Sequence, residues 1–264
     1  MRVLPVLFYA LCLSLDATAQ FDPSVSQLPS KFVGTDVKTL VRALRTSTAR
    51  GEFESTAQYQ QRLAAATPRP AETHAFRVRA ESITYDSDAE TFTIVPSLTV
   101  PYMGTSPVWA KAALVSDDVA ETSAYEGRNG FGAAVAVQQV VREIHMVQAT
   151  PPWREATPSF TVRVPRDKAA IRKPNLKVLL LARFSSADAL PESVPQTLHV
   201  KFDGATGWNH IEPTFQTPKE EISIYFTAVG EFIEWWVYDF VTGEILGRFS
   251  PRVPADVAAT GERQ

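Results

Sequence analysis

The fold class is decided near the C-terminus by residues 221–249, which read EISIYFTAVGEFIEWWVYDFVTGEILGRF. Aromatic and β-branched residues dominate this stretch, and such residues are enriched in β-strands. The pattern predicts an antiparallel meander of three strands, at residues 221–229, 232–240 and 244–249. Gly243 lies in the last turn, where a glycine can adopt the positive φ that a tight turn requires.

The middle strand of this meander is apolar on both faces. Strand alternation puts one set of side chains on one face (Phe232, Trp236, Tyr238 and Phe240) and another set on the opposite face (Ile233, Trp235 and Val237). Such a strand is either covered on both sides, which is the usual arrangement, or it presents one face to a partner. The second alternative gives a candidate binding platform for a peptide, a glycan or a protein, made of Trp236, Tyr238 and Phe240.

Upstream of the meander, further strands are expected in two β-rich halves, residues 71–148 and 159–250. The individual strands are predicted at residues 76–85, 92–96, 98–102, 108–115, 160–164, 176–184 and 197–202. Residues 116–130 are polar and are predicted to form a long loop. Residues 132–148 fit either a helix or a bulged strand, and their β-branched content favours the strand.

Proline-rich and polar stretches set the expected boundaries. Residues 149–158 contain three prolines and are interpreted as a linker between the two β-rich halves. Residues 251–264 are interpreted as a flexible tail.

Two helices are expected between residues 20 and 70. An apolar stripe predicts the first helix at residues 36–48, and a capping box formed by Ser55 and Gln58 predicts the start of the second. Prolines at 68 and 70 end the second helix. The fold class predicted from the whole chain is α+β: an N-terminal helical hairpin plus a mainly antiparallel β region of about ten strands.

The first 19 residues have the layout of a secretory signal peptide. A cation at Arg2 precedes an apolar run at residues 3–15, and Ala17-Thr18-Ala19 supplies a small-x-small cleavage site. As a helix this run would be about 20 Å long, shorter than the roughly 30 Å hydrocarbon core of a membrane. The sequence therefore predicts cleavage after Ala19 and a periplasmic mature chain with no membrane span.

Composition narrows the class of protein further. The chain has 264 residues with 26 Lys and Arg, 29 Asp and Glu, and a net charge of −3, which argues against nucleic-acid binding. Its only cysteine, Cys12, lies in the predicted signal peptide, so the mature chain has no disulfide and no thiolate nucleophile. The absence of disulfides favours a bacterial periplasmic protein.

Local motifs do not identify a reaction. Asp86, Asp88 and Glu90 have the spacing of the start of a calcium loop, but Thr91 occupies the position that calcium loops give to glycine, so a hairpin turn is expected. The four histidines have no metal-binding spacing (His74, His145, His199 and His210). No nucleophile elbow or phosphate-binding glycine loop occurs. We therefore predict no catalytic residue, metal or cofactor, and lean away from an enzyme.

One segment resembles a known group of proteins. Residues 51–62 read GEFESTAQYQQR, which is similar to the G-E-F-E-[ST]-[ST]-x-x-[YF]-x-x-R helix-entry segment of uncharacterised exported bacterial proteins. The resemblance implies an exported α+β protein and supplies no active site.

The expected function is that of an exported periplasmic binding or interaction protein. An envelope accessory factor, or an inhibitor of a toxin or hydrolase, would fit, with an envelope protein, a peptide or a glycan as partner. The alternative is a cell-envelope hydrolase whose Asp, Glu or His site comes from distant parts of the chain. A titratable cluster in a deep pocket would favour the enzyme, and a shallow aromatic patch would favour the binding protein.

Overall fold

The computed structural model describes residues 21–48, 52–65, 72–99, 111–128, 130–153, 157–184 and 206–251, and this part of the chain is mostly β-structure. Its helices are α1 (Val37–Thr48), α2 (Thr56–Ala65), α3 (Arg166–Arg172) and the 3-10 turn η1 (Lys173–Asn175). Its strands are β1 (Glu72–Val78), β2 (Ala80–Asp86), β3 (Thr91–Pro96), β4 (Leu98–Thr99), β5 (Lys111–Arg128), β6 (Ala134–Trp153), β7 (Phe160–Arg163), β8 (Leu176–Phe184), β9 (Gly207–Ile211), β10 (Lys219–Asp239) and β11 (Ile245–Phe249).

The strands form a large sheet and a small one. The large sheet has the order β1-β8-β10-β6-β5-β4, with β9 and β11 also paired to β10, and the small sheet has the order β2-β3-β7. Strand β10 lies in the middle of this order and joins the two parts of the large sheet. Its first half pairs in parallel with β6, and its second half pairs antiparallel with β8.

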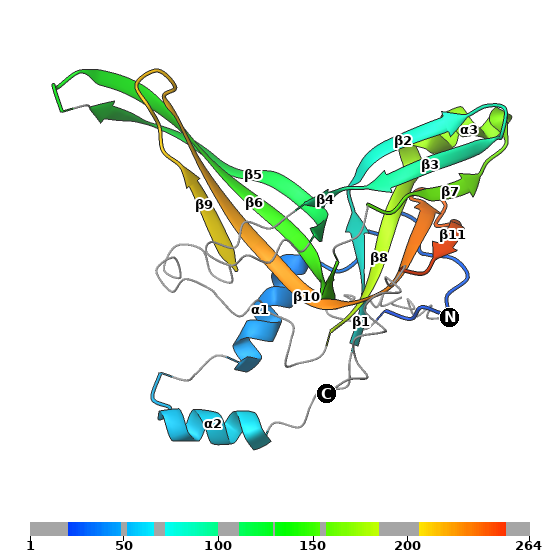
Figure 1. The fold of residues 1–264 in the computed structure, drawn as a ribbon, viewed down its shortest axis with the longest axis horizontal. Helices are drawn as coiled ribbons and strands as arrows, with labels where there is room; N and C mark the ends of the chain where they lie inside the picture. The colour runs from blue at the N-terminus through cyan, green and yellow to red at the C-terminus, as the bar shows by residue number, and fades with distance from the viewer. Residues whose placement is uncertain are drawn as a thin grey trace, which may run out of the picture.

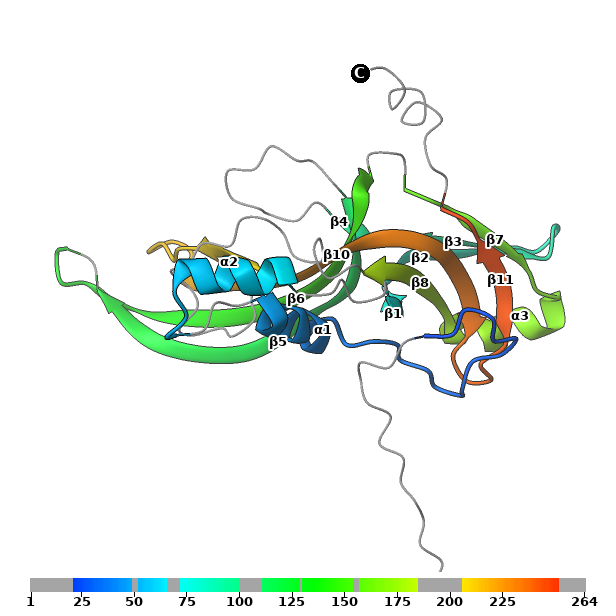
Figure 2. The same cartoon turned by 90° about the horizontal axis from the view of Figure 1, so that it is seen from below.

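The chain therefore has two regions joined by β10 (Figure 1). We call β5, β6, β9 and residues 219–230 of β10 the arm; in Figure 1 it projects to the upper left. We call β1, β8, β11, residues 231–239 of β10 and the small sheet the body. Figure 2 shows the arm and the body extending in opposite directions from the middle of β10.

The predicted meander is wrong at its first turn. Residues 221–229 and 232–240 are not two strands, because β10 runs without a turn through both. Gly230 is required for a close approach instead: a Cβ there would lie 2.8 Å from the Arg183 carbonyl oxygen and 2.8 Å from the Phe184 ring. A single glycine inside a strand pattern can indicate either a turn or the close approach of a neighbouring backbone. The last turn forms as predicted, with Gly243 at φ 75°.

Two predictions about irregular segments are also corrected. Residues 116–128, expected in a loop, form the outer part of β5, and residues 149–153, expected in the linker, continue β6. The outer part of β5 is solvent-exposed on both faces from residue 118 to 126. A strand with no buried face has no apolar alternation, so its sequence looks like a loop. The strand interpretation of residues 132–148 is confirmed, whereas the strand predicted at 197–202 lies outside the described residues.

The predicted α+β class with an N-terminal helical hairpin is wrong. Both helices form, and the capping box is present, with Ser55 N donating to Gln58 Oε1 (2.9 Å) and Gln58 N donating to Ser55 Oγ (3.2 Å). However, α1 packs its apolar stripe on β6 and β10, with Val37 and Val41 fully buried. The helix-entry residue Phe53 is 92% exposed. The sheet, rather than α2, therefore buries the apolar face of α1.

The body has a core on each face of the large sheet. One cluster fills the space towards the small sheet, where Trp235 packs on Phe160 with ring centroids 5.5 Å apart. The second cluster lies on the opposite face and includes Leu179, Trp236 and Tyr238.

The N-terminal residues 21–35, which we call the strap, cover the second cluster. Phe21 contacts Trp236 edge-on at 5.5 Å, and the Tyr238 hydroxyl donates to the Phe32 carbonyl oxygen at 2.7 Å. Leu28 N donates to the Gly243 carbonyl oxygen at 2.9 Å. The strap therefore closes the face of the body that would otherwise expose its aromatic residues.

Candidate functional site

The predicted aromatic platform is buried under the strap. Trp236 and Tyr238 are 0% exposed, and Phe240 is half-buried. Arg248 stacks over the Trp236 ring at 4.1 Å and holds the strap by donating to the Pro23 and Val25 carbonyl oxygens. The three predicted residues do share one face, but in this structure that face is closed. The structure instead agrees with the other alternative, a strand that is covered on both sides.

A bulge corrects the predicted alternation at the start of this segment. The register between β10 and β8 shifts between Phe232 and Glu234, so Ile233 has no direct partner. Phe232 therefore packs edge-on against Trp235 at 5.8 Å, instead of lying on the Trp236 face. From Trp235 to Tyr238 the alternation is as predicted.

The open candidate site is a row of polar side chains across four strands of the arm. The register pairs Ser123 of β5 with Gln139 of β6, and Gln139 with Glu220 of β10. His210 of β9 lies opposite Ile222, one diagonal step from Glu220. Residues two apart on a strand share a face, so these side chains meet. With Tyr125 and Trp208 on the same face, we call this set the arm cluster.

Glu220 is the centre of the arm cluster. Its Oε2 accepts a hydrogen bond from Gln139 Nε2 at 2.6 Å, and its Oε1 lies 2.7 Å from His210 Nε2. The Tyr125 hydroxyl also hydrogen-bonds to this carboxylate. Ser123 Oγ donates to Gln139 Oε1 at 3.2 Å, which extends the network to β5. The Glu220 carboxylate thus accepts hydrogen bonds from residues of β5, β6 and β9.

The network fixes the charge state of Glu220. Burial raises the pKa of its carboxyl, but the hydrogen bonds from Gln139, His210 and Tyr125 outweigh this effect and leave the pKa below its ordinary value. Burial and the negative charge of Glu220 both raise the pKa of the Tyr125 hydroxyl. At neutral pH Glu220 is therefore an anion, and Tyr125 and His210 Nε2 are donors to it.

Aromatic surface adjoins this anion. The Trp208 ring stacks on His210 with an interplanar angle of 28° and a centroid separation of 6.2 Å. Trp208 is half-buried and Tyr125 is exposed. The arm cluster is therefore an ordered polar network with an aromatic group on each side, on an exposed sheet.

Helix α1 limits the arm cluster on its inner side. Lys38 Nζ lies 2.6 and 2.7 Å from the two carboxylate oxygens of Glu143, and 5.0 Å from the centroid of the Phe226 ring. Glu143 shares a face with Gln139, four residues away on β6. Among the described residues, α1 therefore covers this face near the body.

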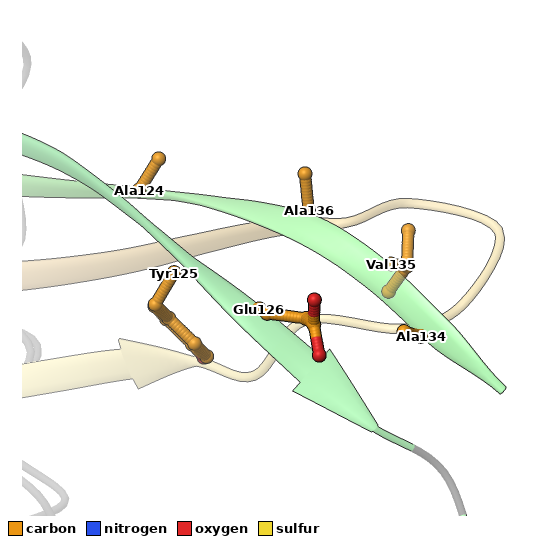
Figure 3. Close-up of a pocket in the computed structure, with 6 residues that line it drawn as sticks. All are labelled: Ala124, Tyr125, Glu126, Ala134, Val135 and Ala136. Carbon is orange, nitrogen blue, oxygen red and sulfur yellow. The ribbon is translucent and has the colours of Figure 1, made fainter. Parts of the chain in front are cut away.

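An open hollow of about 350 Å³ lies at the outer end of the arm, on the β5–β6 hairpin. Its lining is small and apolar except for two residues: Ala124, Ala134, Val135 and Ala136, with Tyr125 and Glu126. Figure 3 shows Ala124 and Tyr125 projecting to opposite sides of the hairpin. The hollow is thus a surface feature of the hairpin rather than a deep catalytic pocket.

The arm cluster orients groups but supplies no evident nucleophile. Within the described residues, the only side-chain hydrogen bond of His210 joins it to Glu220. The Glu220 carboxylate already accepts three hydrogen bonds.

The acidic residues at 86–90 form the turn that their spacing predicted. Asp86 Oδ1 accepts hydrogen bonds from Asp88 N (2.9 Å) and Ala89 N (3.0 Å), which also lower the pKa of Asp86. Arg166 Nη2 donates to the Ser87 carbonyl oxygen at 2.6 Å. Over the described ranges, no group of three or more His, Cys, Asp or Glu side chains is placed to hold a metal ion.

Sequence reasoning missed the arm cluster for a specific reason. His210 and Glu220 carry no local motif, and their partners Ser123 and Tyr125 lie in the segment interpreted as a loop. The available signal was the polar alternation of the outer strands, but it becomes meaningful only when the pairing register is known.

Comparison with known proteins adds no further information on function. No protein-family model, no curated protein and no solved structure matches the chain. Among the described residues, no helix has the length and apolar character needed to cross a membrane.

Proposed function

We propose that the chain is an exported periplasmic binding or interaction protein that recognises an envelope partner through the arm cluster. Export would follow cleavage after Ala19, in line with the signal-peptide pattern of residues 1–19. In support, Phe21, the second residue of the predicted mature chain, is already part of the fold: its N–H donates to the Thr73 carbonyl oxygen at 2.7 Å.

The observation that carries the proposal is the order of the arm cluster on an exposed sheet. Tyr125 and His210 are held by a buried carboxylate, so they lose little conformational freedom when a partner binds. Trp208 and Tyr125 provide the flat, amphipathic surfaces that are enriched at protein interfaces. Such a preorganised surface recognises a polar partner, an envelope protein or a peptide, without a deep pocket.

A second candidate function, an envelope hydrolase, rests on the Glu220–His210 pair. A carboxylate that orients a histidine is a common catalytic arrangement. In such an enzyme, His210→Ala would abolish turnover of the substrate and leave partner contact intact. In the binding protein, His210→Ala would weaken partner contact itself.

Site-specific photocross-linking in intact cells tests the proposal. A photoreactive phenylalanine analogue replaces Trp208, and a matched probe replaces Ile171 on α3, which is exposed and lies in the body's periphery. We expect a discrete cross-linked product from position 208 that disappears in the Glu220→Gln background, and none from position 171. The same products from both positions, or none from 208, would contradict the proposal.

A further inference from the structure

The topology brings two turns to the outer end of the arm. Strands β5 and β6 form one hairpin, and β9 and β10 form another. Because β6 and β10 are parallel neighbours, both begin at the same end of the sheet. The turns before β6 and before β10 therefore lie towards the same end of the arm. The β5–β6 hairpin continues four residue pairs beyond the first β6–β10 pair, Gln138 and Lys219, so its turn projects farther, as Figures 1 and 2 show.

Each of these turns exposes a phenylalanine. Phe131, between β5 and β6, is 99% exposed, and Phe215, between β9 and β10, is 58% exposed. Tyr125 and Ile211 are exposed directly behind the two turns. Single exposed apolar residues need no explanation, but several at one end of a projecting element indicate an interaction surface.

The end of the arm is also uncharged. Residues 130–137 read GFGAAVAV and residues 213–218 read PTFQTP, with no acidic or basic side chain in either segment. No atom lies within 4 Å of a Cβ built on Gly130 or Gly132, the glycines on either side of Phe131. Moving these two segments out of water would therefore carry no free-energy cost for desolvating a charged side chain.

Charged residues begin immediately behind this apolar end. Arg128 closes β5 and Lys219 opens β10, and both side chains are exposed. They form ion pairs with Glu126 and Glu221, at 2.7 and 3.2 Å, while Glu212 is a further nearby anion. Exposed pairs of this kind are weak and exchange readily. Arg128 and Lys219 are thus placed to meet lipid phosphates when the phenylalanines lie in the acyl boundary.

We propose that the outer end of the arm docks on a lipid surface by inserting Phe131 and Phe215 into the interface of the bilayer. Two convex turns on separate hairpins fit a fluid surface, which needs no pair of pockets at a matching separation. The turn backbone stays at headgroup depth, where water and polar headgroups satisfy its N–H and C=O groups. This inference does not depend on the arm cluster, which lies further in.

Flotation with lipid vesicles tests the inference. The mature protein is mixed with vesicles of phosphatidylethanolamine and phosphatidylglycerol, and the bound fraction is measured after centrifugation. We expect wild-type protein to float with the vesicles and the Phe131→Ser/Phe215→Ser variant to bind at least about tenfold more weakly, since each phenylalanine contributes its apolar burial. Ile171→Ser, which removes an exposed apolar residue from α3, should bind as wild type does.

A second variant reports insertion directly. Phe131→Trp should add a fluorescence component that shifts to shorter wavelength when vesicles are added, because the new indole leaves water. Failure of the wild-type protein to float, or equal flotation of the double serine variant, would overturn the inference. A Phe131 probe that cross-links only to protein in cells, with no vesicle binding, would overturn it in favour of a protein partner.

Discussion

Strand β10 runs through both the body and the arm, so its two halves allow the two regions to be compared. In the body half, Trp235, Trp236 and Tyr238 are at most 1% exposed, because the small sheet covers one face and the strap covers the other. In the arm half, α1 covers only the inner part of one face. Near the centre of the sheet the arm half is buried as well, with Ile224, Phe226 and Ala228 at most 1% exposed, and the arm cluster around Glu220 lies beyond these residues. The difference teaches that the most aromatic segment of the sequence is not the most accessible one.

The largest expected difference between the regions comes from replacing tryptophan by alanine. Trp235→Ala and Trp236→Ala each remove a large, fully buried aromatic side chain, so each should lower the free energy of unfolding by about 3–5 kcal/mol. Trp208→Ala, in the arm, should cost less than about 1 kcal/mol. Chemical denaturation measures all three. Equal losses in the two regions would refute the division into body and arm.

Glycine positions give the next largest contrast. Gly243 has φ 75°, and an added Cβ would collide with the Leu28 carbonyl oxygen of the strap, so Gly243→Ala should cost at least about 2 kcal/mol. Gly132 has φ 82° but no neighbour within 4 Å, so Gly132→Ala should cost about 1 kcal/mol from backbone strain alone. Thermal melts of the two variants compare them. If Gly132→Ala were the more damaging change, the strap would not be docked as described.

The sequence predicted local elements well where one face of each is buried. Strand β3 lies where alternation placed it, because a buried face imposes apolar periodicity, whereas the single strand expected at residues 76–85 is two strands, β1 and β2, in different sheets. Strand β8, which is buried on both faces, also lies where its apolar run predicted it. Failures occurred at Gly230 of β10 and in the exposed outer part of β5. The double burial of β10 made Gly230 look like a turn, and the exposure of residues 118–126 made a strand look like a loop. The arm cluster depends on register between distant strands, which no local pattern contains.

Two tyrosines separate the regions by their response to alkaline pH. Burial raises the pKa of Tyr238 to about 12, from an ordinary value of 10.0. A pKa raised on folding means that stability is full below the unfolded value and is lost as pH rises through the folded one. Wild-type stability should therefore fall between about pH 10 and 12, and Tyr238→Phe should reduce that fall while costing about 1 kcal/mol at neutral pH.

Tyr125→Phe is the matched change in the arm. Because Tyr125 is exposed, this variant should leave neutral-pH stability nearly unchanged. Urea denaturation at a series of pH values distinguishes the two variants. An alkaline profile that Tyr238→Phe leaves unaltered would show that the Tyr238 hydroxyl is not held against the strap.

The smallest expected effect is the change in the free energy of unfolding that Glu220→Gln causes at acidic pH. The pKa of Glu220 is lowered by its hydrogen bonds, so its contribution is present above the ordinary carboxyl pKa and is lost as pH falls through the lowered value. Glu220→Gln should destabilise the chain by less than about 1 kcal/mol at pH 7, with a difference from wild type that shrinks in acid. Glu126→Gln, which changes an exposed ion pair at the hollow, is the control and should show no such trend.

The division between a folded body and a recognising arm is tested most directly by shortening the β5–β6 hairpin. Residues 122–140 are replaced by Asn-Gly, which joins the paired residues Glu121 and Val141 through a type I′ turn. We predict a cooperative melt close to that of the wild type, together with loss of the cross-link from position 208 and of vesicle binding. A body that no longer folds, or binding that survives the deletion, would contradict the account.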